Sequence, residues 1–77
     1  MNKSRRERVA DIADMLSDMR DRISEILEEE EEYRDNIPEN LQGSERYEKA
    51  DEACDTLDTC GESLEEIVVL LQGLAED

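Results

Sequence analysis

Apolar residues recur along the first half of the chain at strictly alternating intervals of three and four. Positions so spaced lie on one side of an α-helix, and this regularity is typical of a coiled coil. Glu30 is the one polar interruption. The pattern predicts a helix from about residue 4 to about residue 34, with Ser4 and Glu7 as a capping box at its start. The stripe consists of Val9, Ile12, Leu16, Met19, Ile23, Ile26, Glu30, Tyr33 and Ile37.

Residues 35–44 break this pattern and predict a turn. Pro38 disfavours a helical conformation at the residue before it, so the first helix is expected to end there. Asn36 and Asn40 favour turns and caps. Ser44 is a natural N-cap for a second helix, which is expected from about residue 45 to about residue 75.

The second helix repeats the three-and-four spacing, and a further row at intervals of seven widens its apolar face. Gly61 inside it predicts either a close approach by another helix or a kink. Two helices of matched length joined by a short turn predict an all-α fold, an antiparallel helical hairpin forming one domain over residues 1–77. The main stripe is Tyr47, Ala50, Cys54, Leu57, Gly61, Leu64, Val68, Leu71 and Ala75, and the flanking row is Ala53, Cys60, Ile67 and Leu74.

A hairpin of 77 residues has little material for a core of its own, because 36% of its residues are hydrophobic and only 3% aromatic. Domains this short usually need oligomerisation, metal or disulfides. The wide face of the second helix therefore predicts a homo-oligomeric helical bundle. Its expected interface is Leu57, Gly61, Leu64, Ile67, Val68, Leu71 and Leu74.

The net charge of −15 predicts repulsion from nucleic acids and anionic membranes, and attraction to basic partners. Histidine is absent, so imidazole bases, triads and zinc ligands are excluded. No phosphate-binding glycine loop or calcium loop occurs. We therefore expect no catalysis, metal or cofactor. With no export signal or membrane span expected, Cys54 and Cys60 are interpreted as reduced core residues of a cytoplasmic protein.

Acidic residues follow the same spacing on the faces opposite the two stripes. Such rows are either a solvated surface or an imitation of the phosphates of nucleic acid. Their nearly unmixed sign keeps the second reading open, since a face selected for stability would interleave lysines. The rows are Asp11, Asp14, Asp18, Asp21, Glu25, Glu28, Glu32 and Asp35 in the first helix, and Glu48, Asp51, Glu52, Asp55, Asp58, Glu62 and Glu65 in the second.

The turn and the start of the second helix carry more varied chemistry. Arg46 could hold a phosphate and Tyr47 could stack on a base, while Asn40, Gln42 and Ser44 could bind polar edges. In an oligomer these turns could form a pocket for an anionic nucleotide. The alternative is a well-capped turn that closes the end of the core.

From residue 28 onward the chain resembles small acidic helical-hairpin proteins of phages and prophages, a group with no settled activity. Its Pro-Glu-Asn-Leu-Gln-Gly-Ser-Glu-Arg segment is the most specific part of the resemblance, whereas Cys54, Cys60 and Gly61 replace the usual aliphatic residues. The matching residues are Glu28 to Glu32, Tyr33, Asp35, Asn36, Pro38, Glu39, Leu41, Ser44, Glu45, Arg46 and the stretch 50–64.

The resemblance implies counter-defence against an infected bacterial host. One hypothesis is an oligomeric sponge that sequesters a cyclic-nucleotide or ADP-ribose-type immune signal at Asn40, Gln42, Ser44, Arg46 and Tyr47. A second is an acidic DNA mimic that blocks a basic DNA-binding host protein. A third is a structural or regulatory module that binds another protein.

Overall fold

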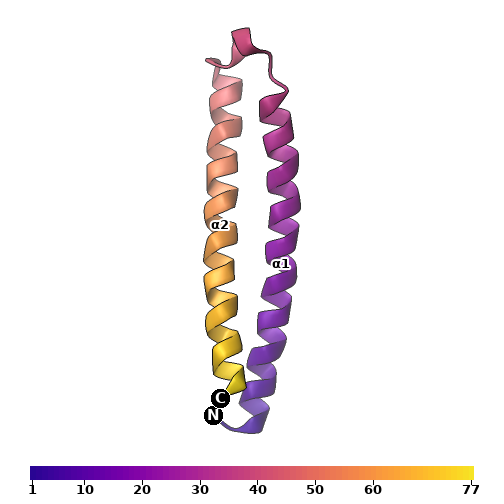
Figure 1. Cartoon of the computed structure of the whole chain (residues 1–77), viewed down its shortest axis with the longest axis vertical. Helices are drawn as coiled ribbons and strands as arrows, with labels where there is room; N and C mark the ends of the chain where they lie inside the picture. The colour runs from indigo at the N-terminus through magenta and orange to yellow at the C-terminus, as the bar shows by residue number, and fades with distance from the viewer.

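The computed structural model describes all of residues 1–77 and shows a single helical hairpin. Helix α1 covers Lys3–Asp35, a short 3-10 helix η1 covers Glu39–Leu41, and helix α2 covers Glu45–Glu76. The two long helices pack antiparallel into a rod of 59 × 14 × 13 Å. Both termini lie at one end of the rod and the turn at the other (Figure 1). The predicted all-α hairpin is therefore confirmed.

The ends of the helices follow from local hydrogen bonds. Ser44 caps α2 as predicted, because its Oγ accepts a hydrogen bond from the backbone N–H of Tyr47 at 3.3 Å. The prediction for α1 is wrong by two residues: Asn2 is the cap, and its Oδ1 accepts from the N–H of Arg5 at 2.8 Å. Asparagine caps helices as well as serine does, so the helix extends back to it.

The apolar stripe predicted for α1 splits into two rows. Val9, Leu16 and Ile23 face α2, but Ile12 and Met19 are each 48% exposed. A single partner helix covers only one side of a stripe. Helix α2 lies on the side of Ala13 and Arg20, the residues that directly follow Ile12 and Met19. The residues that replace the exposed row against α2 are Ala13, Arg20, Leu27 and Arg34.

Helix α2 presents its predicted main stripe to α1. Ala50, Cys54 and Val68 are buried, and the rest of the stripe is half-buried. The flanking row lies mostly outside, with Ile67 44% and Leu74 43% exposed. With Ala13 and Ile37, only five residues of the hairpin are buried. A core this small shows that the hairpin buries only part of the apolar surface of its helices.

One expectation for α2 is wrong, and another finds no support within the hairpin. A Cβ built on Gly61 would meet nothing within 4 Å, so α1 does not approach closely at this glycine. Cys54 is buried as predicted, but Cys60 is exposed and is not a core residue. Cys60 is exposed because α1 lies on the Cys54 side of α2. Gly61 lies on that inner side and lines a hollow with Ile23 and Leu27 of α1.

Candidate interaction faces

The exposed rows of the two helices lie on the same side of the hairpin. Arg46 of α2 donates from Nε to the hydroxyl of Tyr33 of α1 at 2.6 Å, and its guanidinium carbon lies 5.3 Å from the centre of the ring. Tyr33 belongs to the exposed row of α1, and Arg46 lies seven residues before Ala53 in the flanking row of α2. Residues seven apart share a side of a helix. We call this side the apolar face; its rows are Ile12, Met19, Ile26 and Tyr33, and Arg46, Ala53, Cys60, Ile67 and Leu74.

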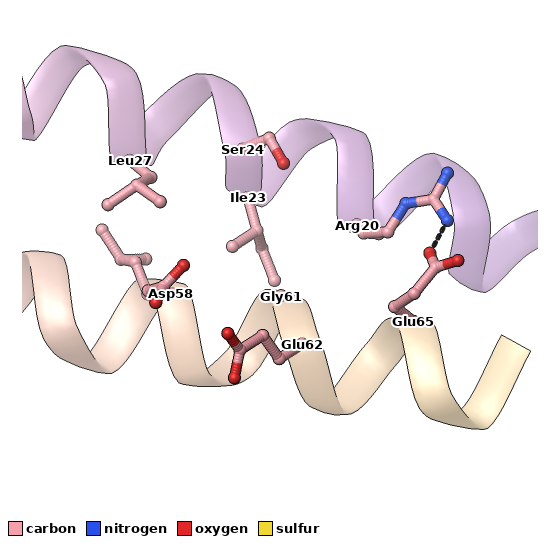
Figure 2. Close-up of a pocket in the computed structure, with 9 residues that line it drawn as sticks. Arg20, Ile23, Ser24, Leu27, Asp58, Gly61, Glu62 and Glu65 are labelled. Carbon is pink, nitrogen blue, oxygen red and sulfur yellow. Dashed lines mark hydrogen bonds and ion pairs between the residues drawn. The ribbon is translucent and has the colours of Figure 1, made fainter.

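The opposite side of the hairpin is acidic. A shallow hollow of about 230 Å³ brings Ser24 of α1 together with Asp58 and Glu62 of α2 (Figure 2). A second hollow brings Asp14 together with Glu76. These hollows place Asp14 of α1 on the same side as the predicted acidic row of α2, and we call this side the acidic face. The other half of the acidic row predicted for α1 lies on the outer edge of that helix instead, at Asp11, Asp18, Glu25 and Glu32. The acidic face comprises Asp14, Asp21, Glu28 and Asp35 of α1, and Glu48, Asp51, Asp55, Asp58, Glu62 and Glu65 of α2.

Two arginines of α1 tie the acidic face together at its border with the core. Arg20 pairs with Glu65 across the helices, as Figure 2 shows, and Arg34 bonds both Asp35 and Asp51 at 3.0 Å. The hydrogen bond that Arg34 donates to the Asp35 carboxylate raises the pKa of Arg34 above its ordinary value, against the opposing effect of burial. Both arginines belong to the row of α1 that faces α2, together with Ala13 and Leu27. They were not predicted from the sequence, because the number of these charges was considered and not their position on the helix.

Charge therefore divides unequally between the two faces. The exposed cations Arg8, Arg22 and Lys49 lie beside the rows of the apolar face, one helical turn from its members. Between Ile26 and Tyr33 this side of α1 carries one outward carboxylate, Glu29. The net charge of −15 is thus concentrated on the acidic face and along the outer edges of the helices.

The residues predicted to bind a nucleotide do not converge within one hairpin. Ser44 is occupied as a helix cap, Arg46 is engaged by Tyr33, and Tyr47 is half-buried against α1. Asn40 and Gln42 are exposed in the turn. None of the three hollows of the surface is lined by a turn residue. A pocket at this end would require a second chain, and the site stays a prediction.

The predicted oligomer interface divides in the same way. Val68 is only 2% exposed and is used against α1, so it offers no surface to a second chain while the hairpin is intact. Leu57, Gly61, Leu64 and Leu71 lie half-buried on this inner side. Ile67 and Leu74 are the two predicted interface residues that the hairpin leaves open.

Reactive groups are few. Burial raises the pKa of the Cys54 thiol, which keeps it protonated at neutral pH and makes it a poor nucleophile. No three ligating side chains gather closely enough to hold a metal ion. Neither helix combines the length and the apolar character needed to cross a membrane.

Comparison with protein-family models, with curated proteins and with solved structures found no match for this chain. The candidate function therefore has to be inferred from the two faces themselves.

Proposed function

We propose that this protein is a non-catalytic binding module that presents its acidic face to a basic, nucleic-acid-binding surface of another protein. The observation that carries the proposal is that the acidic row of α2 and half of the acidic row of α1 lie on one side of the rod. In a monomeric helix pair built only for solubility, carboxylates and cations would be mixed on every exposed side.

The geometry suits imitation of a polyanion. Along α2 successive carboxylates of the acidic face lie about one turn, roughly 5–6 Å, apart, and along α1 they lie two turns, roughly 10.5 Å, apart. Two such rows run side by side along a rod 59 Å long. A basic cleft that binds DNA does so largely by exchanging condensed counterions for phosphate contacts, and this electrostatic attraction does not depend on sequence. A rigid rod of carboxylates can compete for the same cations. In the phage setting suggested by the turn motif, such a module would block a host DNA-binding protein.

The test is competition for a basic DNA-binding protein already loaded with fluorescent duplex DNA. We expect the hairpin to displace the duplex, and its apparent affinity to fall steeply with salt because the contacts are ionic. Asp21→Lys combined with Asp58→Lys reverses charge at the centre of the acidic face. This variant is expected to weaken competition by roughly 10-fold or more, since close charge pairs at interfaces contribute several kcal/mol.

The matched control is Glu29→Lys combined with Glu39→Lys, which changes the net charge equally but lies off the acidic face. Competition equal to that of the unchanged protein is expected from this control. If both variants lose the same affinity, the effect belongs to net charge alone, and the assignment to the acidic face is wrong.

A second function, the binding of a small anionic nucleotide signal at the turn, is favoured by one observation. Arg46, Lys49 and Tyr33 lie at the turn end of the apolar face, off the acidic face, and Lys49 pairs there with the exposed Glu45 at 3.1 Å. An anion approaching from this side meets cations and an aromatic ring. In an oligomer, two such clusters could complete the pocket that a single hairpin lacks.

A thermal-shift panel of cyclic di- and trinucleotides and ADP-ribose-type compounds tests this second function. A ligand at a hundred times its Kd stabilises the folded state by about 2.7 kcal/mol. Arg46→Ala is expected to abolish the shift without changing helicity or mass, whereas the matched change Arg22→Ala is expected to preserve it. A panel without any shift would leave only the acidic-face proposal.

A further inference from the structure

The largest exposed apolar surface of the hairpin lies on the apolar face, in the half near the termini. Its α1 members Ile12 and Met19 are each 48% exposed, and its α2 members Ile67 and Leu74 are 44% and 43% exposed. Met15 and Leu70, 62% and 73% exposed, lie at its outer borders, where Leu70 also lines a hollow with Val69. Large apolar residues scattered singly need no explanation, but four gathered on one side of a small acidic protein, with two more at the borders, indicate an interaction site.

The two groups lie at the same height along the rod. Arg20 is level with Glu65, and Arg34 with Asp51, so each step along α1 matches an equal step back along α2. By this register Met15 is level with Leu70, and Met19 lies within about one residue of Ile67. The apolar residues of α1 and α2 therefore form one block with equal numbers from each helix.

From this arrangement we infer that the apolar face is the interface of a homodimer, formed around a two-fold axis parallel to the rod. Such an axis places α1 of one copy on α2 of the other, so the Met19 row meets the Ile67 row of the partner. Each helix then has two antiparallel neighbours, as in an up-down-up-down four-helix bundle. A self-complementary surface is what a two-fold interface requires.

The pattern of α1 supports a second copy as the occupant. Its predicted stripe alternates between residues that face α2, such as Leu16, and residues that face outward, such as Met19. A helix with two neighbours in a bundle needs both rows. In the dimer both rows of the three-and-four pattern are therefore packed against a helix, whereas in a single hairpin the outward row is not.

Charge also selects a second copy. Two hairpins carrying −15 each would repel strongly through their acidic faces. The apolar face is the side on which carboxylates are scarce, and pairing through it leaves the acidic faces pointing outward, away from each other. The proposed binding surface thus stays accessible in the dimer, and neither inference depends on the other.

A stable dimer uses the whole length of the apolar face. A rectangle with the length and width of the hairpin covers about 800 Å², which is what each partner gives to an interface of standard size, so the contact extends from the block near the termini to the turn end. The interface would also supplement a core of only five buried residues.

The first test compares Ile67→Lys with Val69→Lys. Both are exposed β-branched residues of α2: the exposed fraction is 44% for Ile67 and 55% for Val69. Ile67 lies on the apolar face, whereas Val69 lies toward the acidic side. In sedimentation equilibrium we expect dimers for the unchanged protein and for Val69→Lys. Ile67→Lys should be monomeric over the same concentrations, with a Kd raised at least 100-fold. A monomeric unchanged protein, or equal masses for the two variants, would overturn the proposal.

The second test needs no disruption of the interface, because Cys60 lies within it. Alkylation of Cys60 by iodoacetamide should slow as protein concentration rises through the dimerisation range. Cys54 is buried within each hairpin and contributes no fast reaction. The control thiol is Ser24→Cys in a Cys60→Ser background, at nearly the same height on the acidic face. A rate at Cys60 as independent of concentration as that of the control would contradict the proposal.

The third test fixes the direction of the two-fold axis. Gly43 has open space around it, so Gly43→Cys in the Cys60→Ser background can carry a spin label at the turn. The inferred axis places both turns at one end of the dimer, and the label–label distance should be far below the 59 Å length of the rod. A distance near the full length would show antiparallel hairpins and overturn the arrangement.

Discussion

Val68→Glu should unfold the hairpin or leave it barely stable. Val68 is 2% exposed, is the largest fully buried side chain and lies between the two helices. The substitution loses the burial of a valine and places a carboxylate in a fully buried position. The expected loss is about 4 kcal/mol or more, a large share of the 5–15 kcal/mol that stabilises a typical domain. Circular dichroism at 222 nm with urea titration measures it.

The adjacent residue supplies a matched control. Val69→Glu makes the same chemical change at a side chain that is 55% exposed. It is expected to change stability by less than about 1 kcal/mol, as surface substitutions usually do. Both variants should be compared at one protein concentration, because dimerisation makes Tm depend on concentration. Equal melting of the two variants would mean that α2 does not present Val68 to α1.

Raising NaCl from 0.01 to 1 M should raise the Tm by roughly 10 °C. The acidic rows contain fourteen carboxylate pairs one turn apart, seven in each helix, and each like-charged pair destabilises a helix by about 0.2–0.5 kcal/mol. This concentration range shortens the Debye length from about 30 to 3 Å and removes most of the repulsion. About 2 kcal/mol of relief corresponds to the expected shift in a domain of this size. Differential scanning calorimetry measures it.

A variant with fewer carboxylates separates charge screening from other effects of salt. Asp21→Asn combined with Asp55→Asn should have a higher Tm at low salt and a smaller rise on adding NaCl. A Tm that stays flat or falls with salt would indicate that the attractive pairs, such as Arg20 with Glu65, outweigh the repulsion. The prediction that repulsion between the carboxylates destabilises the hairpin would then be wrong.

The helical elements could be predicted from the sequence because they depend on local chemistry. Apolar periodicity required two long helices, Pro38 required a break, and the hydroxyl of Ser44 supplied a cap. The start of α1 was misplaced because Asn2 and Ser4 are comparable caps, and nothing local distinguishes them. The candidate nucleotide site was drawn from residues adjacent in sequence. Helix geometry turns Arg46 and Tyr47 to different sides, toward Tyr33 and toward the core.

By itself the sequence determined two amphipathic helices, their turn and the presence of acidic rows, since each of these is a property of a segment and its neighbours along the chain. The tertiary structure alone decided which half of the wide stripe of α1 is covered. That choice depends on where α2 lies around α1, which periodicity leaves open. The same rotation sets Ile12 and Met19 outside, exposes Cys60 and brings the acidic row of α2 and half of that of α1 onto one face.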